Sequence, residues 1–343
     1  MSIDMHSHWR PAGLIELLRQ RSEPPMVVTN DDGVEVFRSR GGDWMTTHDE
    51  AVAECFDNVE QRLAEMDELG ISTGVLSLFG QFCWIERRPS EESVPLCRAY
   101  NDEVSEICKT HPGRFAAYAS LPQWQLSDAI EELNRAMELP GIIGAQIPGN
   151  AFITLQEAEA YRPLMEAANK HKAIMFIHWG PRAGDDWPRT PSHADNFRRR
   201  MGTLDMQASL SANMVTLSMT DYLDDLQELR IHIHNLGGNL PYEIERMDHR
   251  CLLDTPNEDL PSTRFNKPNV FVDCNSFGPR SIEMGVSLYG AEKILLGTDG
   301  TAFGSDWSNK AIADADIGED ARDAILYDNA ARLLSPAVEL APR

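Results

Sequence analysis

Two histidines near the N-terminus, His6 and His8, stand in alternate positions of the sequence IDMHSH. If this stretch forms a strand, both side chains project from one face, because successive strand residues point to opposite faces. Two neighbouring imidazoles at the end of a strand provide half of a binding site for a first-row metal. A tag remnant or a solvated N-terminus is the alternative interpretation, and the ends of the other strands decide between the two.

Further polar residues occur where later apolar stretches end. His178 ends the stretch AIMFIH, and Asp299 ends KILLGTD. The stretch LRIHIHN ends in His232, His234 and Asn235. Each residue alone would suit a core histidine or a turn, but three imidazoles and a carboxylate at separate strand ends are what zinc or manganese requires. The remaining histidines lack this placement, and we interpret them as structural: His48, His111, His171, His193 and His249.

The apolar stretches that end in these residues alternate with helical segments along the chain. Eight strands and about eight helices in one chain of this length predict a (β/α)₈ (TIM) barrel, whose active site lies at the C-terminal ends of the strands. A doubly wound sheet is the alternative, but its glycine-rich phosphate loop is absent after the first strand. The predicted strands cover residues 3–8, 74–80, 115–122, 142–149, 173–180, 229–235, 270–276 and 293–299.

A small insertion, covering about residues 21–46, interrupts the alternation after the first strand. Residues 26–37 predict a β-hairpin with its turn at 30–33 (NDDG). No linker or internal repeat divides the chain, so we expect residues 1–343 to form a single domain with this insertion. The predicted helices cover residues 11–20, 47–69, 90–109, 127–138, 155–171, 204–217, 242–251, 281–289 and 319–334.

The composition excludes several classes of protein. With 31 basic and 54 acidic residues, the formal net charge of −23 disfavours binding to nucleic acid and to anionic membranes. Six scattered cysteines without a Cys-x-x-Cys pair indicate free thiols in a reducing compartment. We find no signal sequence and no apolar run as long as a membrane span, and therefore expect a cytoplasmic protein.

Several motifs together resemble a known family. The resemblance rests on IDMHSH, FIHWG, GGNLPYEIERMDHR and LLGTDG, together with RLAEMDELGI, RAYND and HPGRFAAYASLP. These resemble the amidohydrolase superfamily, above all its branch of metal-dependent decarboxylases typified by aminocarboxymuconate-semialdehyde decarboxylase and γ-resorcylate decarboxylase. The resemblance implies one divalent metal, Zn²⁺ by expectation with Mn²⁺ as the alternative, and Asp299 as a group that exchanges a proton with bound water. The implied metal ligands are His6, His8, His178 and Asp299.

One position departs from the pattern of this branch. Its members carry a histidine seven residues before the tyrosine of the Leu-Pro-Tyr motif, and here that position is Asn235. His234 lies one residue earlier, and we expect a one-residue bulge near the glycines of residues 236–238 to turn it toward the metal. We therefore predict His234 as the general acid/base, because imidazole exchanges protons near pH 7, and Asn235 as its hydrogen-bonding neighbour.

An arginine of the helix after the sixth strand is a candidate substrate contact. Arg246 matches an arginine that in this branch binds the substrate carboxylate, in some members across a subunit interface. The resemblance therefore implies a homodimer or a larger homo-oligomer. A surface ion pair with Glu245 or Asp248 is the alternative role.

Other candidate contacts follow the strand ends. Arg10 and Arg182 come shortly after metal-ligand histidines and could offset the acidic protein around an anion, or be ordinary loop charges. Trp179, Trp187 and Phe303 could line a pocket for a planar substrate, although packing is the commoner role of such aromatics.

Three functions fit these observations. The first is a non-oxidative decarboxylase of a small aromatic or unsaturated carboxylic acid, in which a proton replaces the carboxylate as CO₂ leaves. The alternative is a metal-dependent hydrolase of a C–C bond, lactone or amide that uses activated water. A binding protein with a vestigial barrel is the third, and the complete set of metal ligands argues against it.

Overall fold

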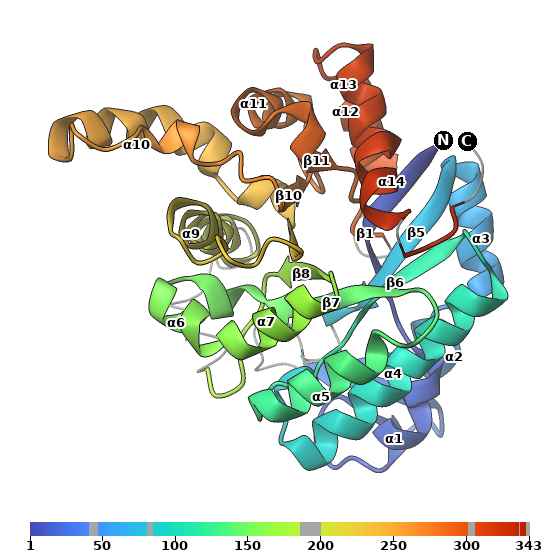
Figure 1. The fold of residues 1–343 in the computed structure, drawn as a ribbon. Helices are drawn as coiled ribbons and strands as arrows, with labels where there is room; N and C mark the ends of the chain where they lie inside the picture. Colours follow the sequence, from blue (N-terminus) through green and yellow to red (C-terminus); the bar gives the residue numbers. More distant parts are fainter. Residues whose placement is uncertain (41–46, 81–84, 186–199, 301–305, 336, 341–343) are drawn as a thin grey trace.

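The computed structural model has eight parallel strands that form a nearly closed barrel (Figure 1). The strands pair in their sequence order, and the last returns to the first through a parallel bridge from Ser7 to Gly300 and a hydrogen bond from Met5 N to Leu296 O. This arrangement confirms the predicted (β/α)₈ barrel. The strands are β1 (Ser2–Trp9), β5 (Ile71–Leu78), β6 (Phe115–Ala119), β7 (Ile142–Pro148), β8 (Ile174–His178), β9 (Arg230–Ile233), β10 (Val270–Asp273) and β11 (Ile294–Leu295).

The structure describes residues 1–40, 47–80, 85–185, 200–300, 306–335 and 337–340. Four residues considered above lie outside these ranges: Cys83, Trp187, His193 and Phe303. The other five cysteines are free and buried. Within the described ranges, every helix is too short or too polar to cross a lipid bilayer.

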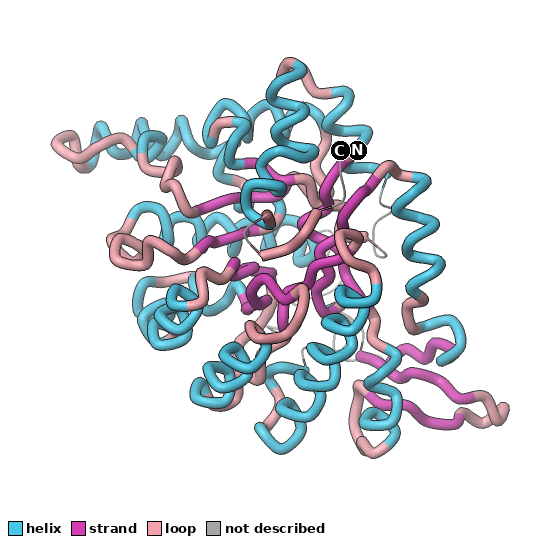
Figure 2. The backbone as a smooth tube through the Cα atoms, turned by 45° about the vertical axis from the view of Figure 1, so that its right-hand side comes forward, coloured by secondary structure: helices cyan, strands magenta, loops and turns pink. Residues whose placement is uncertain are grey.

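Helices surround the barrel, as Figure 2 shows for the cyan segments around the magenta strands. The segment predicted as one helix over 155–171 is two helices that meet at Tyr161, because Pro163 suits the first turn of a new helix and not a helix interior. The helix α12 was not predicted. The helices after β5 are α4 (Ser90–Thr110), α5 (Leu126–Ala136), α6 (Leu155–Ala160), α7 (Arg162–Lys170), α9 (Met206–Met219), α10 (Leu240–Asp254), α11 (Pro279–Tyr289), α12 (Asp306–Asp314), α13 (Glu319–Asp323) and α14 (Asn329–Leu334).

The insertion after β1 and α1 (Ile15–Arg19) is a three-stranded antiparallel sheet. The predicted hairpin is present as β2 (Met26–Thr29) and β3 (Glu35–Arg40). The third strand, β4 (Thr47–Ala51), corrects the helix predicted over 47–69. Pairing with β3 outweighs the helical pattern of this segment, and the helical part is divided into α2 (Val52–Cys55) and α3 (Val59–Glu68).

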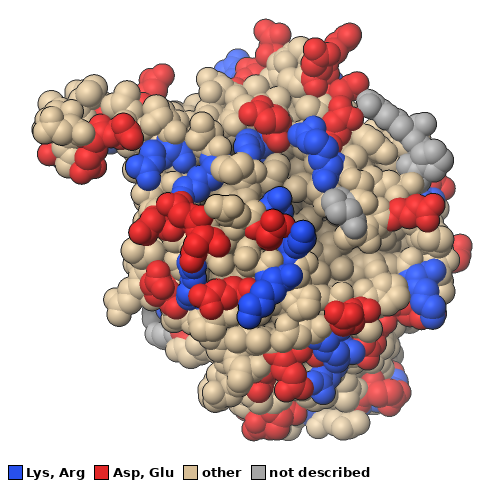
Figure 3. All heavy atoms as spheres, viewed as in Figure 1, with Lys and Arg blue, Asp and Glu red and all other residues tan. Residues whose placement is uncertain are grey.

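The helix α10 extends away from the body of the protein (Figure 1). Its exposed surface includes large apolar side chains, with Tyr242 77%, Leu252 57% and Leu253 60% exposed. On the face that Figure 3 presents, acidic side chains are interspersed with basic ones and do not leave a wide basic area.

Candidate metal centre

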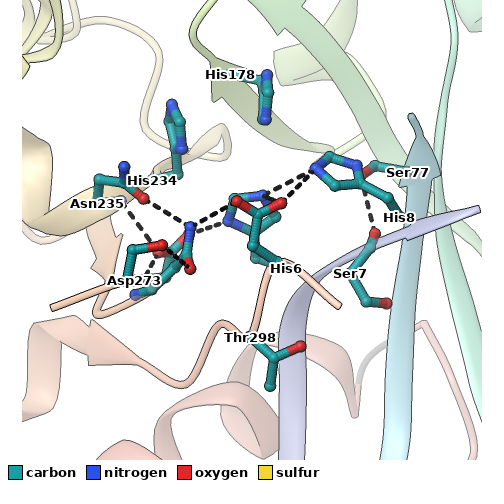
Figure 4. A network of polar contacts seen from close by, with 12 residues as sticks. His6, Ser7, His8, Ser77, His178, His234, Asn235, Asp273 and Thr298 are labelled. Atoms are coloured by element: carbon teal, nitrogen blue, oxygen red, sulfur yellow. Dashed lines mark hydrogen bonds and ion pairs between the residues drawn. The ribbon is translucent and has the colours of Figure 1, made fainter. Parts of the chain in front are cut away.

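Five ionisable side chains meet where strands of the barrel end (Figure 4). The Nε2 atoms of His6 and His8 are 3.3 Å apart, and Asp299 Oδ1 lies 2.9 Å from His8 Nε2. The ring of His178 is 5.4 Å from that of His6, between centroids. Two triplets have ligand atoms close enough to share a metal ion: His6, His8 and Asp299, and His6, His178 and His234.

Hydrogen bonds determine which ring nitrogen of His8 and His178 is free. Ser77 Oγ donates its only proton to Ser7 O, so it must accept the hydrogen bond from His8 Nδ1, at 2.9 Å. The carbonyl oxygen of Trp179 can only accept, and it lies 3.0 Å from His178 Nδ1. Both imidazoles in their neutral form therefore carry the proton on Nδ1 and a lone pair on Nε2.

The same reasoning applies to His6. Its Nδ1 lies 3.0 Å from Oδ2 of Asp273, a fully buried residue of β10. A carboxylate accepts this hydrogen bond, so Nε2 of neutral His6 also presents a lone pair. Three imidazole lone pairs and the carboxylate of Asp299 thus point into one buried space without a proton donor among them. Such a donor set fits a divalent cation, and outer partners of this kind commonly orient metal-binding histidines.

His234 is oriented differently from these three histidines. Its ring stacks on that of His178, at 4.5 Å and 15° between planes, and its Nε2 accepts a hydrogen bond from Trp179 N at 2.9 Å. The proton of neutral His234 is therefore on Nδ1, which is buried and has no partner among the described residues. Burial, followed by the charge of His6, lowers the pKa of His234 to about 3. Although its distance suits a metal ligand, this tautomer makes His234 a hydrogen-bond donor.

The electrostatics of the cluster favour one added positive charge. Burial lowers the pKa of His178 well below its ordinary value. Burial also acts to lower the pKa of His6, but the carboxylates of Asp273 and Asp299 raise it overall. Burial acts to raise the pKa of Asp299, and the charge of His6, followed by the proximity of His8, lowers it overall. The space between His6 and Asp299 therefore attracts a cation, either a proton or a metal ion.

The strand before His234 is regular, so no bulge is needed to direct His234 into the site. β9 pairs with β8 and β10 without a register shift. His232 and His234 both approach Phe176, with centroids at 4.5 and 6.2 Å, as expected for alternate residues on one side of a strand. The irregular backbone begins one residue later. Four consecutive residues have positive φ: Asn235, Leu236, Gly237 and Gly238.

Asn235 lies beside His234 (Figure 4). Its side chain is connected to Asp299 through a second amide. Asn275 Nδ2 donates to Asn235 Oδ1 at 2.8 Å and to Asp299 Oδ2 at 3.1 Å. Asn275 thus orients the carboxylate of Asp299. Neither Asp273 nor Asn275 was predicted as a site residue, although Asp273 ends the strand VFVD and Asn275 follows it by two residues, a position that could have identified both.

The predicted substrate contacts differ in their surroundings. Arg10 forms ion pairs with Asp57 and Glu50, at 3.2 and 3.3 Å. Arg182 likewise contacts Asp185 and Glu157, each at 3.0 Å. These contacts agree with the alternative that both are loop charges.

The other two predicted substrate contacts in the described residues are Arg246 and Trp179. Arg246 is exposed on α10, and its guanidinium has no ion pair with Glu245, Asp248 or any other described residue. Trp179 is half-buried, and its backbone contacts His178 and His234.

Comparison with known proteins identifies related sequences. The profile of the amidohydrolase family matches residues 87–335. The chain is 27% identical over 288 residues to γ-resorcylate decarboxylase of Rhizobium sp. strain MTP-10005, which covers 76% of this chain and 83% of that protein. It is 24% identical over 250 residues to 2-amino-3-carboxymuconate-6-semialdehyde decarboxylase of Dictyostelium discoideum, which covers 71% of this chain and 67% of that protein.

A solved structure has the same fold. The dihydroxybenzoic acid decarboxylase of Polaromonas sp. JS666 matches with a TM-score of 0.70 and 22% identity, over 97% of this chain and 96% of that chain. That structure contains manganese and the inhibitor 2-nitroresorcinol.

Proposed function

The chain belongs to the amidohydrolase family, and we propose that it is a metal-dependent, non-oxidative decarboxylase of a small aromatic or unsaturated carboxylic acid. The observation that carries the proposal is the buried cluster in which three imidazole lone pairs and one carboxylate converge beside a donating imidazole, His234. The activities of the Rhizobium and Dictyostelium relatives support a carboxy-lyase.

The metal of this proposal is a single divalent ion. Imidazole and carboxylate ligands suit Zn²⁺, which we expect, and also Mn²⁺, which is present in the Polaromonas structure. When bound, the ion would supply Lewis-acid chemistry toward substrate oxygens. Its proposed ligands are His6, His8, His178 and Asp299.

Proton transfer is assigned to His234 and Asp299. Decarboxylation breaks a carbon–carboxylate bond, and the carbon must gain a proton as CO₂ leaves. His234 is the proposed general acid/base, because its Nδ1 is directed to no described acceptor. The negative charge of a bound carboxylate would raise the pKa of this ring from about 3, so that the ring could take up the proton that it passes to the carbon. Asp299 is the second group proposed to exchange a proton. Asn235 helps to orient its carboxylate, because both accept hydrogen bonds from the amide of Asn275.

Binding of an anionic substrate to this acidic protein needs cationic and aromatic contacts as well. Arg246 is the preferred cation, since Arg10 and Arg182 each share their charge with two carboxylates. Trp179 is proposed to line the substrate pocket, because its backbone is hydrogen-bonded to both His178 and His234 and its side chain is half-buried.

Isotope incorporation tests the reaction directly. In D₂O, we expect turnover of hydroxybenzoates or unsaturated semialdehyde acids to release CO₂ and to leave one deuterium on the carbon that carried the carboxylate. Mass spectrometry of a small substrate panel, which also includes lactones, measures both changes. A hydrolase would instead give products that have gained water and that carry ¹⁸O from H₂¹⁸O. Products of this second kind alone would replace the decarboxylase with the alternative function.

We also propose that the active form is a homodimer or a larger homo-oligomer. Arg246 lies on a helix that extends from the body and exposes Tyr242, Leu252 and Leu253. Light scattering at assay concentration is expected to give at least twice the chain mass of 38.4 kDa. Arg246→Ala is expected to raise KM by about 10-fold or more, as loss of a charged hydrogen bond typically costs about 1.5–3 kcal/mol. A fully active monomer would contradict this proposal.

The cytoplasm is the compartment that we propose. Five described cysteines are free and buried, which suits a reducing environment.

A further inference from the structure

A chain of buried hydrogen bonds leads from His6 into the interior of the barrel. Asp273 Oδ2 lies 3.0 Å from His6 Nδ1 and 2.9 Å from His232 Nε2. On the far side of His232, Nδ1 lies 3.0 Å from the hydroxyl of Tyr118. These four residues come from β1, β10, β9 and β6, and all are completely buried.

The chemistry of the four groups fixes the direction of each hydrogen bond in this series. The carboxylate of Asp273 is an acceptor, so both His6 Nδ1 and His232 Nε2 donate to it. Neutral His232 then has a lone pair on Nδ1, and the hydroxyl of Tyr118 must donate to that lone pair. Tyr118 thus donates to His232, and His232 donates to Asp273. From the other side, His6 donates to Asp273 through Nδ1, which leaves a lone pair on His6 Nε2.

Asp273 also connects the chain to the turn that follows His234. Its second oxygen, Oδ1, accepts hydrogen bonds from the backbone N–H groups of Asn235 and Asn275, each at 3.0 Å. One carboxylate therefore satisfies four donors from three parts of the site. Gly297 makes room for this arrangement, because a Cβ there would lie 2.9 Å from Asp273 Cγ and from His6 Cβ.

Aromatic packing holds the chain in place. The ring of Phe176 stacks on Tyr118 at 4.9 Å and on His232 at 4.5 Å, and it meets the edge of His6 at 4.8 Å. Apolar contacts therefore enclose these hydrogen bonds. In such surroundings hydrogen bonds are stronger than in water, and an unpaired polar group destabilises the protein.

We propose that Tyr118, His232 and Asp273 form a positioning relay that keeps His6 in the tautomer able to bind the metal through Nε2. The inference rests on the metal centre of the proposed function, but it concerns residues that do not touch the metal or the substrate. Outer partners of metal ligands commonly change metal affinity by about 10- to 100-fold.

The most informative pair of variants is Tyr118→Phe and Tyr100→Phe. Both tyrosines are fully buried, and Tyr100 donates its hydroxyl to the backbone oxygen of Tyr118, outside the relay. Both variants lose one buried hydrogen bond, so both are expected to lose similar thermal stability. Only Tyr118→Phe is expected to weaken Zn²⁺ binding. The expected loss is about 3- to 10-fold, at the low end for an outer partner, because Tyr118 acts on His6 through His232 and Asp273. Competition with a chelator of known affinity measures this binding.

Two other variants test the middle of the relay. His232→Gln can place an amide N–H where Nε2 donates to Asp273, whereas His232→Leu cannot. We expect the glutamine to retain most of the metal affinity and the leucine to lose about 10-fold. Asp273→Asn would place amide hydrogens against donating groups, and about 10- to 100-fold weaker binding is expected. The visible spectrum of the Co²⁺-substituted protein should change in the same order across the series.

The possible results separate this inference from the proposed reaction. Equal metal affinities of Tyr118→Phe, Tyr100→Phe and the wild type, with unchanged Co²⁺ spectra, would overturn the relay. A wild-type protein that binds the metal but decarboxylates no acid would overturn the reaction and leave the relay standing. A wild-type protein that binds no divalent metal would overturn both.

Discussion

Replacement of His178 by alanine is expected to remove the metal and to lower activity by about 10³-fold or more, equivalent to about 4 kcal/mol. The reason is that His178 Nε2 is one of only three proposed imidazole ligands, and its Nδ1 is already committed to the oxygen of Trp179. Elemental analysis should give about one divalent metal per wild-type chain after purification without added salt. The same measurement should give close to none for His178→Ala.

His171→Ala is the matched control for this variant. His171 follows α7, is hydrogen-bonded to Asn134, and precedes β8, whose opposite end carries His178. It should retain both metal and activity. Chelation of the wild type should reproduce the loss seen in His178→Ala, and added Zn²⁺ or Mn²⁺ should restore the wild type only. Full metal occupancy in His178→Ala would contradict the assignment of His178 as a metal ligand.

The second large effect is expected at His234. His234→Ala should lose about 10²- to 10⁴-fold in kcat, the range typical of a general acid/base, while it keeps its metal. Metal retention follows from the tautomer, in which Nε2 accepts from Trp179 N and the lone pair needed for coordination is absent from Nδ1. Steady-state kinetics together with metal analysis of the same preparation measure the two quantities. Loss of the metal in parallel with activity would instead make His234 a ligand.

Two companion variants refine this assignment. His234→Asn can place an amide N–H near the position of Nδ1, which donates a hydrogen bond but does not transfer a proton. If proton transfer is the role of His234, the asparagine variant should be as slow as the alanine variant. Asn235→Ala should lose less, because Asn235 acts on Asp299 through Asn275. An impaired Asn235→Ala beside a nearly normal His234→Ala would reverse the two roles.

Much of the site could be predicted from local sequence patterns. Strand alternation placed His6 and His8 on one side, and barrel topology brings strand ends together whatever lies between them. Both rules act on residues that are close in sequence or on the order of elements, so they can be read from a single chain. The same alternation also put His234 on the side of His232, and the bulge invoked to explain its position was unnecessary.

Only the tertiary structure decided which atoms of these residues are free to act. The protons on His6, His8, His178 and His234 depend on hydrogen bonds to Asp273, Ser77 and the backbone of Trp179, and the first two partners are 267 and 69 residues distant. Likewise, β4 is a strand because it pairs with β3, although a helix was predicted from residue 47. Sequence periodicity reports which way a side chain points from its own strand or helix. It carries no information about the donor or acceptor that a distant segment places against that side chain, and that partner determines whether an imidazole binds a metal or donates a proton.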